Sequence, residues 1–337
     1  MPPRPGPRLG LCCTFLEQPI RFRTTTARFA ATLAARERRK HLHGIALDNA
    51  AALVRAVEWC AANGVGAFRV TSKLLPLSTH RELGYGLADI DRDGAVETIL
   101  RQAGRLAARQ GVRLSFHPDQ FVVPGSAREE VVRSSIAEIE AQALLAEKIG
   151  AEQLTLHGGG AQGGKRAALE RLARGLGRLS ARARSRVALE NDDRVYTVRD
   201  LLPLCRREGV PLVYDVHHHR CNPDGLCEEE ATDGAAETWG RREPWAHLSS
   251  PRQGWTAPDP RFHADYIDPR DVPAAWRARR MTIDVEAKAK ERAVLALKRA
   301  RAPGGCGKPP AGSSLSLRLR PGVGRRGCGS GGGGSRG

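Results

Sequence analysis

Eight short apolar runs, separated by longer amphipathic stretches, constrain the fold of this chain more than any other feature of its sequence. Each run is short and partly β-branched, which is typical of buried parallel strands. The runs cover residues 8–15, 67–72, 113–118, 153–158, 186–191, 211–217, 245–250 and 281–287.

The stretches between the runs repeat apolar residues at helical spacing. They predict helices over 47–63, 95–110, 126–149, 166–179, 197–208 and 286–300. Asn63-Gly64 is a C-capping signal, and Ser126 with Glu129 three residues later fits a capping box. Strand alternating with helix predicts a parallel sheet. Eight repeats over about 290 residues favour a (β/α)₈ TIM barrel.

An open, doubly wound sheet is the alternative architecture. It would need a Gly-rich phosphate-binding loop after the first strand, and Cys12-Cys13-Thr14 forms no such loop. We therefore expect one barrel domain over residues 1–300. From residue 301 onward the chain is Gly-rich and has basic but no acidic residues, which predicts a disordered tail over 301–337. Its charge could add weak DNA affinity, or the tail could have no role.

The composition points to a soluble protein with a polyanionic partner. Fifty-four basic residues against 37 acidic ones give a formal charge of +17, and nucleic acid is the first candidate for such a surplus. The N-terminus lacks the apolar stretch of a signal peptide, and no apolar run is long enough to cross a membrane. The eight cysteines show no disulfide or zinc spacing, and Cys221 and Cys227 are expected to be free thiols. We expect a cytoplasmic monomer.

Histidines and carboxylates gather where the predicted strands end. Eight of the ten histidines lie there or in the loops that follow: His80, His117, His157, His217, His218, His219, His247 and His263. Glu190, Asp215 and Glu286 join them, and the strand ends of a barrel share one mouth. Burying so many ionisable groups requires a counter-charge. Imidazole and carboxylate donors suit a cluster of two or three divalent ions, Mn²⁺, Zn²⁺ or Fe²⁺.

Nine segments, in this order along the chain, resemble the motifs of UV DNA damage endonucleases. They are RFRTTT, FRVTSKLLPLSTH, RLSFHPDQFVV, LHGGG, LENDD, LVYDVHHH, HLSSP, HADYID and DVEAKAKE. The resemblance covers roughly residues 8–297. It implies an enzyme that nicks damaged double-stranded DNA immediately 5′ to a pyrimidine dimer or an abasic site. It also implies a cluster that is typically manganese.

Matching motif by motif, the resemblance assigns roles to individual residues. Glu190, Asp215, Glu286 and Lys165 would be catalytic, and Gln120 and Phe121 would probe the lesion. Strand alternation alone favours His217 over His218, whereas the resemblance selects His218. The implied metal ligands are His80, His117, His157, Glu190, Asp215, His218, His247, His263 and Glu286.

Two of these residues have a plainer alternative, and two positions depart from the family. Phe121 could be a core residue heading the apolar run 121–123, and Lys165 could be a solvated loop lysine rather than a phosphate contact. Trp245 stands where some relatives have a lysine, and Leu11 where some have a tyrosine. Two other functions stay open: an abasic-site endonuclease of the endonuclease IV type, and a metal-dependent sugar isomerase.

Overall fold

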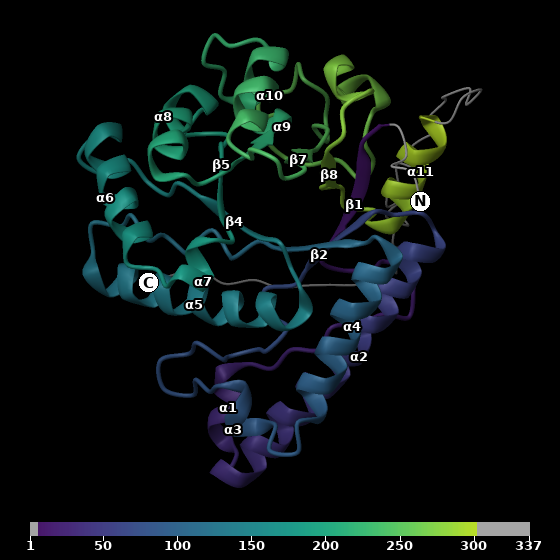
Figure 1. Ribbon diagram of the computed structural model, residues 1–337, viewed down its shortest axis with the longest axis vertical. Helices are drawn as coiled ribbons and strands as arrows, with labels where there is room; N and C mark the ends of the chain where they lie inside the picture. Colours follow the sequence, from purple (N-terminus) through teal and green to yellow (C-terminus); the bar gives the residue numbers. More distant parts are fainter. Residues whose placement is uncertain (1–5, 302–337) are drawn as a thin grey trace, which may run out of the picture. The chain divides into compact units, whose positions relative to one another are not determined.

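Eight parallel strands close into a barrel in this computed structural model, which describes residues 6–301 (Figure 1). Each strand pairs with the next, and β8 pairs with β1 through Leu9 and Ile283. The TIM barrel is therefore confirmed, while the predicted tail lies outside the described residues except for Arg301. The strands are β1 Arg8–Cys12, β2 Ala67–Val70, β3 Arg113–Phe116, β4 Gln153–His157, β5 Val187–Glu190, β6 Leu212–Asp215, β7 Trp245–Leu248 and β8 Thr282–Val285.

Helices form the outer layer around the strands (Figure 1). The helix predicted over 95–110 is present with those bounds, whereas the one predicted over 47–63 begins earlier, at Ala35. The helices are α1 Ala27–Thr32, α2 Ala35–Ala62, α3 Leu87–Ile90, α4 Ala95–Gln110, α5 Glu129–Ile149, α6 Lys165–Gly177, α7 Ala181–Arg184, α8 Val198–Glu208, α9 Val216–Cys221, α10 Glu228–Glu237 and α11 Glu291–Ala300. Two 3₁₀ turns, η1 Pro269–Asp271 and η2 Ala274–Trp276, precede β8.

The capping box predicted at Ser126 was wrong. Helix α5 begins at Glu129, and its N-cap Arg128 has no side-chain capping bond. The Ser126 hydroxyl instead accepts from the Arg128 N–H at 3.2 Å in the loop before the helix. The last helix also starts later than predicted, at Glu291, because Lys290 takes a left-handed φ of 50° just before it.

The three consecutive histidines do not end the sixth strand, as predicted, but lie in α9 directly after it. The Asp215 carboxylate caps this helix by accepting from the His218 N–H at 2.8 Å. Helical geometry turns successive side chains by about 100°. As a result, His217 and His218 face different surroundings, and strand alternation does not apply to them.

The inside of the barrel holds buried charged and polar side chains. Arg69 of β2 and Asp284 of β8 form a buried ion pair there, with Nε and Oδ2 3.0 Å apart. Gly10 makes room for the carboxylate, since a Cβ at this position would lie 2.3 Å from Asp284 Oδ1. The apolar core instead lies between strands and helices, around residues such as Leu53 and Leu100. Six cysteines within residues 6–301 are free, and no helix in that range is long and apolar enough to span a membrane.

Candidate metal centre

Glu190 lies at the centre of the barrel mouth, and its two carboxylate oxygens face two different groups of imidazoles. It ends β5 and is 1% exposed. Oε2 is 2.8 Å from His117 Nε2 and 3.8 Å from His157 Nε2. Oε1 is 2.7 Å from His247 Nδ1 and 3.5 Å from His218 Nδ1. This one carboxylate therefore belongs to two groups of possible metal donors.

Asp215 adds a second carboxylate on the Oε1 side. It is fully buried, and its Oδ2 has no hydrogen-bond partner within residues 6–301. This oxygen lies 3.6 Å from His218 Nδ1 and 4.0 Å from His247 Nδ1. A buried carboxylate oxygen without a donor is costly unless something positive occupies the space beside it. The donor set therefore fits a divalent cation.

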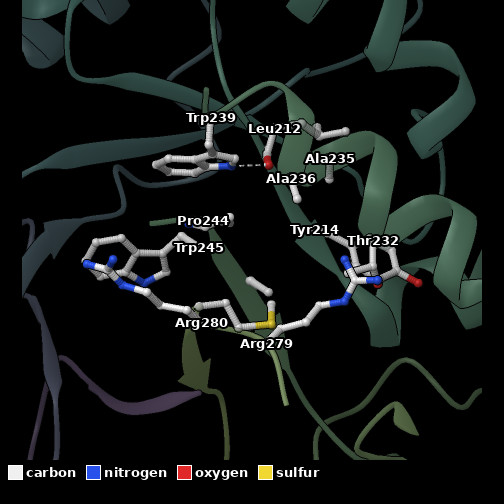
Figure 2. Close-up of a pocket in the computed structure, with 12 residues that line it drawn as sticks. Leu212, Tyr214, Thr232, Ala235, Ala236, Trp239, Pro244, Trp245, Arg279 and Arg280 are labelled. Carbon is white, nitrogen blue, oxygen red and sulfur yellow. Dashed lines mark hydrogen bonds between the residues drawn. The ribbon is translucent and has the colours of Figure 1, made fainter. Parts of the chain in front are cut away.

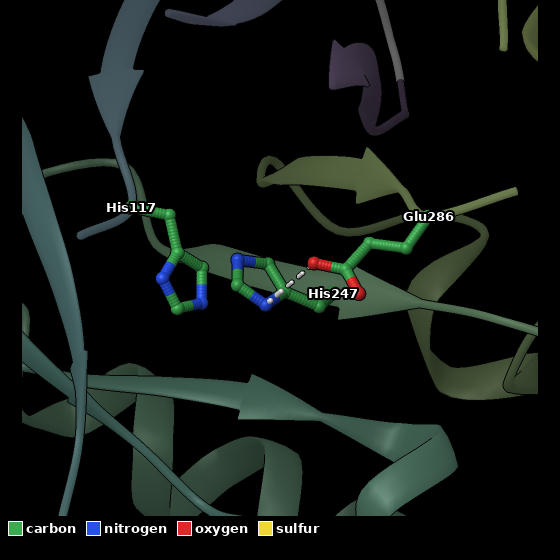
Figure 3. Close-up of side chains that lie close together, drawn as sticks. All are labelled: His117, His247 and Glu286. Carbon is green, nitrogen blue, oxygen red and sulfur yellow. Dashed lines mark ion pairs between the residues drawn. The ribbon is translucent and has the colours of Figure 1, made fainter. Parts of the chain in front are cut away.

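Glu286 and His263 lie at the outer edge of the same cluster. Glu286 Oε1 is 3.5 Å from His247 Nδ1, and Oε2 is 3.7 Å from His263 Nδ1. Figure 3 shows His117, His247 and Glu286 turned toward one another. A cavity of about 360 Å³ opens over these groups, and its walls include His117, Gln120, His157, Glu190, His218 and His263.

The electrostatics keep the carboxylates ionised. Burial raises the pKa of Glu190, but His247 and His157 outweigh it and hold that pKa well below its ordinary range. Burial likewise raises the pKa of Glu286, but Arg69 and His247 outweigh burial and lower that pKa below its ordinary value. Burial lowers the pKa of His218, yet Asp215 and Glu190 raise it to about 9. Without a metal, the cluster therefore holds a proton at His218 at neutral pH.

Arg69 is the component of the site that sequence analysis missed. Its guanidinium lies inside the barrel, 2.5 Å from Glu286 Oε1 and 2.7 Å from His247 Nε2. Because arginine stays protonated, it donates to Nε2. Neutral His247 then carries its proton on Nδ1 and donates it to Glu190 Oε1, 2.7 Å away. The only signal in the sequence was a cationic residue inside an apolar strand.

Eight of the nine implied ligands come together, and His80 stands apart from them. His80 Nδ1 accepts the backbone N–H groups of Glu82 and Leu83 at 3.2 and 3.3 Å. Within residues 6–301 it makes no hydrogen bond or ion pair with the other eight. His217 does not join the Glu190 cluster either: it is buried against Trp255 and His263, with ring centroids 5.1 Å apart in both pairs.

The two residues expected to probe the lesion lie at the rim of the mouth. Phe121 is 77% exposed, so the alternative that it belongs to the core was wrong. Gln120 is exposed and lines the cavity over the cluster. Lys165 begins α6 rather than lying in a loop, and its Nζ is 2.6 Å from Asp200 Oδ2.

Trp245 and Leu11, which stand where some relatives have a lysine and a tyrosine, are both buried in the packed interior. Trp245 begins β7 at the end away from the mouth, is 1% exposed, and has the Arg113 guanidinium 4.0 Å from its ring. It borders a separate cavity of about 180 Å³ beside Trp239, whose Nε1 donates to the Leu212 carbonyl (Figure 2). Leu11 is fully buried. Neither substitution removes a side chain from the cluster.

Comparison with known proteins agrees with this geometry. A UV DNA damage endonuclease of Deinococcus radiodurans is 36% identical over 309 residues, covering 87% of this chain and 95% of the relative. One from Bacillus cereus is 32% identical over 244 residues, covering 70% and 74%. The crystal structure of SacUVDE superposes with a TM-score of 0.76 at 28% identity, covering 88% of this chain and 98% of that one.

Endonuclease IV from Thermus thermophilus shares the fold, with a TM-score of 0.57 at 17% identity over 88% of this chain and 97% of that one. The family model described as UV-endonuclease UvdE matches residues 7–303, which include all the described residues except Gly6. This chain belongs to the UV-endonuclease UvdE family.

Proposed function

We propose that this protein is a DNA repair endonuclease that hydrolyses the backbone immediately 5′ to UV photoproducts, with abasic sites as a second class of substrate. The observation that carries the proposal is Glu190, whose two oxygens face separate imidazole groups beneath an open cavity. An enclosed sugar site has no use for the exposed aromatic ring of Phe121 at its rim. The enzyme would act as a cytoplasmic monomer on damaged duplex DNA.

The cofactor we propose is a cluster of two or three divalent ions, with Mn²⁺ ahead of Zn²⁺ and Fe²⁺. His117, His157 and Glu190 would form one group of donors, and Glu190, Asp215 and His247 a second. His218, His263 and Glu286 lie beside these groups. When bound, such ions neutralise the scissile phosphate and lower the pKa of the attacking water.

The protein's own residues supply orientation and charge. Glu190, Asp215 and Glu286 are carboxylates held at the barrel mouth, and they would fix the position of the cations against the DNA backbone. Arg69 holds His247 and Glu286 in place from inside the barrel. Lys165 would contact a phosphate by giving up its ion pair with Asp200, which is solvent-accessible at both ends.

Recognition of damage would depend on Gln120 and Phe121. Both lie just beyond the cluster residue His117, in the loop between β3 and α5. Extruding a base costs a few kcal/mol, and stacking on an aromatic ring returns about 1–3 kcal/mol per base. The exposed ring of Phe121 can enter the gap that extruded bases leave and offset part of the cost of extrusion. Because a damaged duplex costs less to open than an intact one, this gain favours binding at the lesion.

A nicking assay tests the proposal directly. The assay uses three samples of supercoiled plasmid: UV-irradiated, depurinated and untreated. Each is incubated with protein that EDTA has stripped of metal, before and after Mn²⁺ is added. We expect relaxation of irradiated plasmid only with the metal. A labelled oligonucleotide with one pyrimidine dimer should be cut directly on its 5′ side. Nicking of depurinated but not irradiated plasmid would favour an abasic-site endonuclease, and nicking of neither would overturn the proposal.

A further inference from the structure

Large apolar side chains are exposed at four places within residues 6–301, and all four follow the mouth end of a strand. Leu16 and Phe29 follow β1, Phe121 follows β3, and Phe262 follows β7. Single exposed apolar residues are ordinary on a protein surface. It is less ordinary that all four follow the same end of the barrel. The role proposed for Phe121 does not explain why Phe262 is exposed there as well.

The local backbone explains why Phe262 points away from the metal centre. After β7, Pro251 and His263 form an antiparallel bridge, and the Arg252 N–H donates to the Phe262 carbonyl at 2.7 Å. Successive side chains in extended backbone point to opposite sides. His263 faces inward, 3.7 Å from Glu286, and Phe262 therefore faces outward, with 55% of its surface exposed.

Arg252 accompanies this ring. Its guanidinium carbon lies 5.3 Å from the centroid of Phe262, within the range of a cation–π contact. Arg252 is exposed and has no ion-pair partner in the described part of the chain. By contrast, Arg261 next to Phe262 is neutralised by Asp259 at 2.7 Å. The pair thus presents one aromatic face and one unneutralised positive charge.

The strand order places this pair across the mouth from Phe121. In a closed barrel of eight strands, β3 and β7 are four strands apart and therefore lie opposite each other. The candidate metal centre lies between their ends, since His117 follows β3 and His247 belongs to β7. A strand of DNA that runs straight across the centre from the Phe121 side leaves it on the Phe262 side.

We propose that Phe262 and Arg252 form a second DNA contact, in which the ring stacks on an unpaired nucleobase and the guanidinium binds a backbone phosphate. An aromatic face next to a free cation is the chemistry that binds single-stranded nucleic acid. The two rings would hold the distorted region of the duplex from both sides of the cleavage point. This inference rests on the proposed function and adds a second set of DNA-binding residues to it.

Binding to metal-free protein tests the inference without depending on cleavage. Fluorescence anisotropy in EDTA compares a duplex that carries one pyrimidine dimer with its undamaged counterpart. Phe262→Ala and Phe262→Leu should each weaken binding of the damaged duplex by about tenfold or more, while Phe262→Tyr should bind as the parent does. Arg252→Ala should weaken binding to both duplexes and reduce the salt slope by about one unit.

Arg109→Ala is the matched control for Arg252→Ala. Arg109 is exposed in the last turn of α4, at the other end of the barrel, and it too has no ion pair within residues 6–301. Thermal melts show whether a variant is destabilised. Binding by Phe262→Leu within twofold of the parent would overturn the inference, because the leucine keeps the apolar bulk and lacks only the ring face.

The two levels of the proposal fail in different ways. Loss of damage binding in Phe121→Ala with none in Phe262→Ala would overturn the second contact and leave the proposed function standing. A metal-free parent protein that binds damaged and undamaged duplex equally would overturn the second contact, whereas the proposed function fails only if the nicking assay shows no cleavage.

Discussion

Arg69 donates a hydrogen bond to Nε2 of His247, 2.7 Å away, from inside the barrel and below the candidate metal centre. The same guanidinium is paired with Asp284, which is fully buried. A hydrogen bond at one ring nitrogen fixes the orientation of an imidazole and decides which nitrogen carries its proton. Arg69 therefore links the interior of the barrel to the geometry of its mouth.

Arg69→Met should lower both stability and metal affinity. Removing one partner of a buried ion pair costs about 3–5 kcal/mol, and His247 loses its anchor. Adding Asp284→Leu removes the stranded carboxylate, so the double variant should regain much of the lost thermal stability in EDTA. It should not regain metal affinity, as measured by elemental analysis after dialysis. Recovery of both would show that Arg69 only neutralises Asp284.

Glu190→Gln should remove more metal than any other single substitution in the cluster. Both donor groups share this carboxylate, so the amide weakens both, whereas Asp215→Asn affects one. We expect nicking to fall by orders of magnitude and metal content to fall with it. Glu237→Gln makes the same chemical change on the exposed end of α10 and serves as the control. Full metal content in Glu190→Gln would remove this residue from the centre.

His80→Ala should leave the ions held by Glu190 in place. His80 lies outside the two groups, and its ring accepts backbone N–H groups instead. We expect at most one ion to be lost, compared with a larger loss in His117→Ala, whose ring is 2.8 Å from Glu190. Equal losses in the two variants, measured by elemental analysis, would show that His80 moves into the centre when metal binds.

Metal affinity should rise with pH between 6.5 and about 9. The carboxylates of Asp215 and Glu190 outweigh burial and hold the pKa of His218 at about 9, so at neutral pH a cation must displace a proton. Displacing one proton makes the metal affinity rise by about tenfold per pH unit. The rise ends above the pKa of His218, where the ring is already neutral. Calorimetry in buffers of different ionisation enthalpy counts the released protons.

The folding stability of the metal-free protein should instead fall as the pH rises. The raised pKa means that protonated His218 stabilises the fold fully below pH 6.5, and this contribution is lost as the pH rises through about 9. Thermal melts in EDTA across this range check the sign. Metal affinity that is flat over the same range would contradict the placement of His218 beside the ions.

Phe121→Ala and Gln120→Ala should weaken binding to damaged duplex far more than to undamaged duplex. Because Phe121 is 77% exposed, its removal should change the melting temperature little, unlike the loss of a core phenylalanine, which costs about 3–5 kcal/mol. The loss of one stacked base corresponds to about fivefold to a hundredfold in Kd. An equal loss on both duplexes would make Phe121 a general DNA contact rather than a probe of damage.

The strands could be predicted from sequence because each is buried on both faces and is therefore mostly apolar, although β2 and β8 carry the buried pair Arg69 and Asp284. All eight predicted runs contain a strand, and the runs overshoot mainly at their mouth ends, where polar residues take over. Helix α10 was missed because its sequence, EEEATDGAAE, has almost no apolar repeat and is fixed by packing against β6 and α8. Thr197 with Asp200 forms a capping box that was overlooked, in contrast to the one wrongly assigned to Ser126.

The convergence of Glu190, Asp215 and His247 follows from topology alone, since the ends of parallel strands meet at one mouth. The role of Arg69 does not. Its partner Asp284 is 215 residues away, and their contact depends on the register of β1, β2 and β8 and on the missing side chain of Gly10. No local pattern records such a contact, so a buried arginine in a strand shows only that some carboxylate must face it.

The packing of Arg113 on Trp245 affects how ions and DNA reach the candidate metal centre. Together with Glu243 and Thr282, which bind the same guanidinium, it packs side chains into the end of the barrel opposite the mouth. Ions and nucleic acid would then both reach the candidate metal centre through the cavity at the mouth. DNA bound over the mouth would cover this route, so ions should dissociate more slowly from the DNA complex than from the free protein.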